Sequence, residues 1–148
     1  PLMPSSGLSR AEVRRISAWF DDKFHQEVGR LITVEKIDRR FMGAEDGGGG
    51  PDMDVVRVGL HNLNLHLEYL TYLLQSRDWL AGGEMSLADL TAAAHLSCLD
   101  YTGDVPWKLW PVMRDWYARL KSRPSFRPLL ADHVAGMRPP PYYADPDF

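Results

Sequence analysis

The chain has 148 residues, of which 45% are hydrophobic and 25% are charged, a composition typical of one globular domain. Its 17 Lys and Arg against 20 Asp and Glu give a formal net charge of −3, which disfavours a nucleic-acid module because such modules carry a basic excess. The single cysteine, Cys98, excludes an internal disulfide, and no stretch of about 20 apolar residues could insert into a membrane. We therefore expect a soluble cytoplasmic protein.

Residues 1–8 contain Pro, Ser and Gly and are expected to be a linker that enters a helix. Ser9 and Glu12 have the spacing of a capping box, which predicts that this helix begins at Ser9. Apolar residues then recur at spacings of three and four and predict one long helix that ends near Gly43, with a bend at Gly29. These residues are Val13, Ile16, Phe20, Phe24, Val28, Leu31, Ile37 and Phe41.

Charged residues, among them Glu35, Arg39 and Arg40, crowd the end of this helix. They are either a solvated helix end or, beside Ile37 and Phe41, the rim of a partner-binding surface. The glycines of residues 47–50 predict a loop, because glycine destabilises a helix interior by about 1 kcal/mol per residue.

A second helix is predicted from Asp52 or Asp54 to Leu74, since leucines and valines alternate spacings of four and three there. A third helix begins with Ser86 as its N-cap and Asp89 at its third position, so Asp89 is predicted to be a structural cap rather than an acid–base catalyst. Residues 87–99 are nearly all apolar or small, which predicts a central helix that is buried all round and includes Cys98 as a packing thiol.

A fourth helix begins at Pro111 and is stopped by Pro124, and a short fifth helix runs from Ser125 towards Val134. No strand-like alternation is present. The expected fold is therefore an all-α bundle of five to six helices over residues 9–135.

Residues 136–148 are expected to form an extended, non-helical tail, because they combine prolines with aromatic and acidic side chains. Such a tail either docks on a partner or packs on its own bundle, and composition alone leaves both open. Its candidate partner-binding residues are Tyr142, Tyr143, Asp145, Asp147 and Phe148.

The histidines offer no metal site, since none of the five forms an H-x-x-x-H pair and none lies near a cysteine at ligand spacing. The glycine run lacks the Lys-Ser/Thr of a phosphate loop. We assign no catalytic residue, metal or cofactor to these residues.

Two motifs carry a family resemblance. The segment Trp79 to Leu90, WLAGGEMSLADL, and the segment Trp116 to Ser125, WYARLKSRPS, resemble the glutathione S-transferase C-terminal domain. That resemblance implies a five- or six-helix bundle, preceded by a thioredoxin-like domain that binds glutathione and carries the catalytic residue. Nothing in these residues matches that first domain, so its catalytic residues have no positions here.

A narrower resemblance lies in Cys98 to Trp107, CLDYTGDVPW, and in the tail. Both are similar to the alphaproteobacterial FtsZ-localised division proteins, although Pro146 replaces an apolar residue common in that group. The resemblance implies a non-catalytic, cytoplasmic homodimer that binds FtsZ filaments and other divisome proteins at the division site and helps to regulate constriction. The resemblance assigns that contact to the tail residues, whereas Glu35, Arg39 and Arg40 are added to it because of the charge pattern at the end of the first helix.

The alternative is an active glutathione transferase, in which Trp19, Phe20 and Tyr101 line the wall for an apolar substrate. A third possibility is a scaffold whose function is dimerisation alone.

Overall fold

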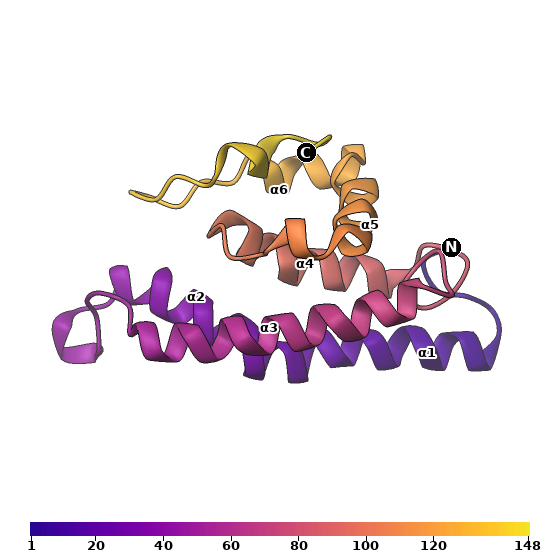
Figure 1. Cartoon of the computed structure of the whole chain (residues 1–148), viewed down its shortest axis with the longest axis horizontal. Helices are drawn as coiled ribbons and strands as arrows, with labels where there is room; N and C mark the ends of the chain where they lie inside the picture. The colour runs from indigo at the N-terminus through magenta and orange to yellow at the C-terminus, as the bar shows by residue number, and fades with distance from the viewer.

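The computed structural model describes all residues, 1–148, and contains six α-helices, with 3-10 and π-helical segments between and after them (Figure 1). The α-helices are α1 (Gly7–Ala18), α2 (Arg30–Lys36), α3 (Met53–Leu74), α4 (Leu87–Tyr101), α5 (Pro111–Lys121) and α6 (Arg127–Leu130). The other helical segments are η1 (Trp19–Gly29), η2 (Asp38–Arg40), η3 (Ala44–Asp46), η4 (Trp107–Leu109), η5 (Pro124–Phe126) and η6 (Pro141–Ala144). The predicted all-α bundle is confirmed. None of these helices combines the length and the apolar character that crossing a membrane requires.

The helices form two layers with the tail outside them. In Figure 1, α1 and α2 run beside α3 in the lower layer, while α4 and α5 lie above it and the tail lies along the top, next to α6. Helix α4 packs on both α1 and α5, so it occupies the centre of the bundle as its small, apolar sequence predicts. One face of α4 nevertheless reaches solvent, because Leu87 is 42% exposed and Cys98, about three turns further along the helix, is an exposed free thiol. The prediction of a fully buried helix with a packing thiol is therefore wrong at these positions.

The first helix begins earlier than predicted, since Ser6 and not Ser9 is its N-cap. Glu12 does not close a capping box. It forms ion pairs with Arg15 and with Arg77, each at 2.8 Å, and these two guanidiniums lower the pKa of Glu12 to about 2. The long-range pair with Arg77 ties α1 to the turn after α3, a contact that local spacing cannot reveal.

The long first helix widens in its middle, because η1 is π-helical over eleven residues. The buried residues are spaced by four throughout this region, at Ile16, Phe20, Phe24, Val28 and Ile32. Ile32, rather than the predicted Leu31, completes the buried stripe. The helix ends at Lys36 in its regular form, and Phe41, predicted to continue the stripe, is 62% exposed.

Candidate functional site

Glu35 closes the loop that follows α2. Its Oε2 accepts hydrogen bonds from the Arg39 guanidinium and from the backbone N–H of Asp52, the latter at 2.8 Å, and Arg39 also donates to the carbonyl of Gly47 at 2.8 Å. The Asp52 N–H and the Arg39 charge lower the pKa of Glu35. The polar groups of Glu35 and Arg39 are thus occupied by hydrogen bonds that hold the loop against the start of α3.

The loop itself is tightly folded. A Cβ on Gly48 would lie 2.0 Å from the carbonyl oxygen of Met42, so only glycine fits at this position. The fold of the loop presents Phe41, which is 62% exposed, and Met42, which is 41% exposed, beside the exposed Arg40. In the sequence, Phe41 fits both the apolar stripe of the first helix and the rim of a partner-binding surface, and its exposure excludes the first at this position. Met42 was not singled out, although an apolar pair followed by a glycine-rich loop is a signal for an exposed tip.

One polar contact joins this loop to the tail, and a second joins the end of α2 to the turn after α4. Arg40 donates to the carbonyl of Gly136 at 2.8 Å, and Lys36 forms an ion pair with Asp104, in the turn after α4, at 2.6 Å. The Gly136 carbonyl lies at the base of the tail. The structure therefore joins the loop after α2 to the base of the tail, whereas tail residues 142–148 lie over α4 and α5.

The tail packs on its own bundle. Tyr143 is only 3% exposed, its hydroxyl donates to the carbonyl of Leu129 at 2.8 Å, and its ring meets Tyr101 edge to face at 5.0 Å. Burial raises the pKa of Tyr143 to about 12. The tail is also not wholly extended as predicted, because Pro141–Ala144 form one 3-10 turn, η6, for which the prolines supply a fixed φ.

The end of the tail inserts a ring over a buried charge. Phe148 meets Trp107 edge to face at 5.5 Å, and the ammonium of Lys121 lies 4.1 Å from the centre of the Phe148 ring. Lys121 also donates to the carbonyl of Tyr142. Both Tyr142 and Phe148 are half-buried by these contacts.

Lys121 belongs to a buried polar cluster that the sequence analysis did not identify. Its ammonium lies 3.8 Å from Asp100 Oδ2, both side chains are fully buried, and Asp100 Oδ1 accepts the indole N–H of Trp107 at 2.8 Å. Burial raises the pKa of Asp100 and lowers that of Lys121. Because Lys121 contacts both Asp100 and the Tyr142 carbonyl, this cluster anchors the tail to α4 and α5.

The acidic residues of the tail are not buried with its rings. Asp145 and Asp147 are exposed, and Asp145 Oδ1 accepts the backbone N–H of Asp147 at 2.9 Å. Neither carboxylate forms an ion pair within the chain. The tail therefore has an aromatic inner side and an acidic outer side.

Ser86 and Asp89 lie at the start of α4. The Asp89 carboxylate accepts the backbone N–H of Ser86 at 2.9 Å, that of Leu80 at 3.0 Å and the indole N–H of Trp116 at 2.9 Å, and its side chain is fully buried. This is the geometry of a capping box with two further donors added.

The residues of the alternative substrate wall do not gather on a surface of this chain. Phe20 is fully buried and Tyr101 is 5% exposed, while Trp19 packs on His66 and Tyr69. No group of three or more His, Cys, Asp and Glu side chains is arranged to hold a metal ion.

Three comparisons place this bundle among known proteins. FtsZ-localized protein A of Caulobacter vibrioides (strain NA1000 / CB15N) is 49% identical over all 148 residues, which span 63% of that protein. The solved structure of FzlA from C. crescentus superimposes with a TM-score of 0.94 at 49% identity, over 100% of this chain and 64% of that chain. A solved structure from Sinorhizobium meliloti 1021, titled a glutathione S-transferase, gives a TM-score of 0.95 at 46% identity, over 99% of this chain and 64% of that one.

The family model named "Glutathione S-transferase, C-terminal domain" matches residues 50–124, which include the start of α4 and its buried Asp89. The helical layers, the capped central helix and this match agree with one another. The chain belongs to the glutathione S-transferase C-terminal domain family.

Proposed function

We propose that this chain is part of a non-catalytic cell-division protein that binds FtsZ filaments at the division site and helps to regulate constriction. The observation that carries the proposal is the 49% identity to FtsZ-localized protein A, which extends over the whole chain, including the tail. The chain spans less than two thirds of that relative, so partner binding by the whole protein belongs to the proposal as well.

The proposed contact surface takes in the loop after α2 and the exposed side of the tail, which are joined where Arg40 contacts Gly136. Arg40, Phe41 and Met42 offer an exposed apolar tip with one cation, and Asp145 and Asp147 offer two free carboxylates. An apolar centre with a charged rim is the usual arrangement of a protein-binding surface.

The remaining predicted partner-binding residues hold the loop and the tail in position and do not form the exposed part of this surface. Glu35 and Arg39 hold the loop, and Tyr142, Tyr143 and Phe148 anchor the tail so that its acids face outward. We assign these five residues a positioning role in FtsZ binding.

The test is co-sedimentation of the intact protein with FtsZ polymerised by GTP. Phe41→Ser and Asp147→Lys change exposed side chains that make no ion pair, and we expect each to reduce the pelleted fraction severalfold. Asp22→Lys, an exposed acid on η1, is the matched control and should pellet like the parent protein. If all variants pellet to the same extent as the parent protein, FtsZ binds elsewhere than this surface. If the parent protein does not pellet with FtsZ, the proposal is overturned.

A second candidate function is glutathione transfer, because the structure from Sinorhizobium meliloti 1021, at 46% identity, is titled a glutathione S-transferase. In that case this chain would supply part of the pocket for the electrophilic substrate. Conjugation of glutathione to an aromatic halide by the intact protein would support this candidate, and absence of conjugation with retained FtsZ binding would exclude it.

A further inference from the structure

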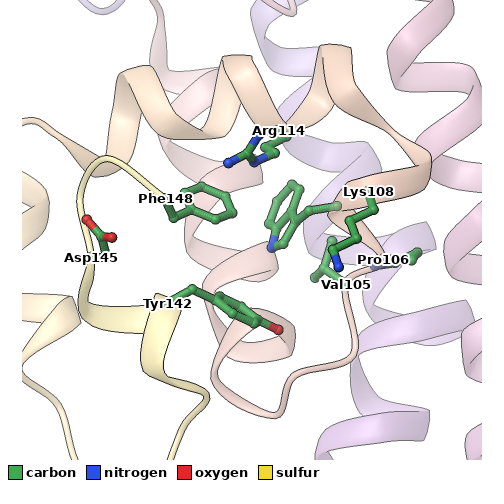
Figure 2. Close-up of a pocket in the computed structure, with 8 residues that line it drawn as sticks. Val105, Pro106, Lys108, Arg114, Tyr142, Asp145 and Phe148 are labelled. Atoms are coloured by element: carbon green, nitrogen blue, oxygen red, sulfur yellow. The ribbon is translucent and has the colours of Figure 1, made fainter.

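A hollow of about 670 Å³ opens between the loop after α4, the first turns of α5 and the tail (Figure 2). Its volume falls within the range of about 300–1,000 Å³ that is usual for small-molecule sites. Figure 2 shows Phe148 and Tyr142 reaching it from the tail, Arg114 from α5, and Lys108 from the connection between α4 and α5.

Aromatic rings form its walls. Trp107, Tyr142 and Phe148 all line the hollow, with Tyr142 and Phe148 nearly parallel at 6.1 Å and Trp107 edge-on to Phe148 at 5.5 Å. Because these rings are fixed by contacts with one another and with the bundle, a flat ligand could stack on them at little cost in side-chain entropy.

Two cations lie beside these rings in the lining of the hollow. Lys108 and Arg114 line the hollow and form no ion pair in the chain. The Arg114 guanidinium lies 5.2 Å from the centre of the Phe148 ring, and the buried Lys121 ammonium lies 4.1 Å from it. The one acid in the lining, Asp145, lies at the outer edge and accepts the backbone N–H of Asp147.

We propose that this hollow is a binding site for a planar aromatic anion. The nearly parallel rings of Tyr142 and Phe148 stack on the aromatic part, and the Trp107 ring meets it edge to face. The carboxylate or sulfonate of the ligand pairs with Arg114 and Lys108. Arginine binds a carboxylate with two parallel hydrogen bonds, so Arg114 supplies the larger share of the specificity for an anion.

The probes are 2-naphthoate and, as its neutral counterpart, 2-naphthylmethanol. Both are titrated into the intact protein labelled with ¹⁵N, and binding is followed at the indole N–H signal of Trp107, a residue that lines the hollow. We expect 2-naphthoate to shift this signal with saturation and to bind at least tenfold more tightly than the alcohol. Arg114→Gln and Lys108→Gln should each raise the Kd of 2-naphthoate, Arg114→Gln by about tenfold.

Arg14→Gln is the matched control, because Arg14 is an exposed arginine of α1 that forms no ion pair. Arg114 contacts Phe148, so its variant could loosen the tail, whereas Lys108 makes no recorded ion-pair or cation–π contact with the tail. Thermal unfolding of each variant shows whether the fold is kept. The proposal is overturned if acid and alcohol bind equally, if Lys108→Gln and Arg114→Gln both behave like Arg14→Gln, or if the Trp107 signal does not move.

Discussion

Asp89 connects three segments of the bundle through one buried carboxylate. Its replacement by alanine would leave the N–H groups of Ser86, Leu80 and Trp116 buried without acceptors, and each such group costs about 1–3 kcal/mol. We expect Asp89→Ala to lower the free energy of unfolding by about 4 kcal/mol, measured by urea denaturation. Asp89→Asn keeps the Oδ1 acceptor and should cost less. A loss below about 1 kcal/mol for Asp89→Ala would contradict this role.

His66 makes the stability of the bundle depend on pH. Its Nδ1 accepts the indole N–H of Trp19 at 3.0 Å and its Nε2 faces Glu27 at 2.8 Å, so the native ring is neutral. Burial lowers the pKa of His66 from 6.5, despite the opposing effect of Glu27. The unfolded chain therefore takes up a proton below pH 6.5 that the native protein resists, and the stability present above this pH is lost as the pH falls towards the native pKa.

The measurement is the free energy of unfolding at pH 7.5 and at pH 5.5 for the parent protein and for His66→Gln. We expect the parent to lose more stability on acidification than the variant, by at most about 1.4 kcal/mol per pH unit. His61→Gln, at an exposed position of the same helix, should behave like the parent. Identical pH dependence in the parent and in His66→Gln would remove His66 as the cause.

At the scale of single residues, the sequence predicts contacts between residues that are close along the chain, but not contacts between distant segments. Ser86 and Asp89 are three residues apart, so their mutual hydrogen bond can be anticipated from spacing. The donors from Leu80 and Trp116 reach the same carboxylate only because α3, α4 and α5 pack together. The pairing of Asp100 with Lys121 likewise joins two helices and leaves no local pattern.

At the scale of elements, the first helix shows that the spacing of apolar residues does not by itself identify which of them are buried. Ile16, Phe20, Phe24, Val28 and Ile32 repeat every four residues, whereas a regular α-helix has 3.6 residues per turn, so this stripe would drift around it. The wider π-helical turns of η1 compensate for the drift and keep all five residues on the core side. A strict four-residue spacing was present in the sequence, but only packing against α3 and α4 shows which residues are buried.

The tail contributes to stability as an element. Removing residues 139–148 would expose Trp107 and Tyr117 and would deprive the buried Lys121 of the Tyr142 carbonyl. We expect this truncation to lower the free energy of unfolding by about 3 kcal/mol, measured by urea denaturation. Asp147→Lys, which changes only an exposed side chain, should leave it within about 0.5 kcal/mol of the parent. An unchanged stability after truncation would mean that the tail does not hold this position in solution.

For the whole molecule, α3 carries an apolar stripe that no other part of the chain covers. Val58, Leu65 and Tyr72 are spaced by seven, lie on the outer side of the helix and are 54%, 54% and 67% exposed. We propose that this stripe contributes to a homodimer, since a second copy would bury it. Leu65→Glu with Tyr72→Glu should lower the sedimentation coefficient of the intact protein from that of a dimer to that of a monomer.

Glu68→Gln, an exposed change on the same helix, is the control for that measurement and should keep the sedimentation coefficient of the parent. A double variant that still sediments as a dimer would place the interface elsewhere.

The candidate surface is also a property of the whole molecule. Sequence reasoning singled out the end of α2 and the tail separately, and it could not show that Arg40 reaches Gly136 across 96 positions of the chain. It also could not separate residues that hold the surface, such as Glu35, from residues exposed on it, such as Phe41, because both lie in the same short segment.

The order in which the tail is attached has a mechanical consequence. Phe148 is held over Lys121, Tyr142 is held by the same lysine, and Tyr143 is held by Leu129, so the anchors follow one another along the chain. A pull at the Phe148 backbone, directed away from α5, loads first the Phe148 ring, then Tyr143 and then Tyr142, rather than all three at once. The force needed to detach the tail would therefore be that needed to break one anchor at a time. The hydrogen bond from Arg40 to the Gly136 carbonyl would break last.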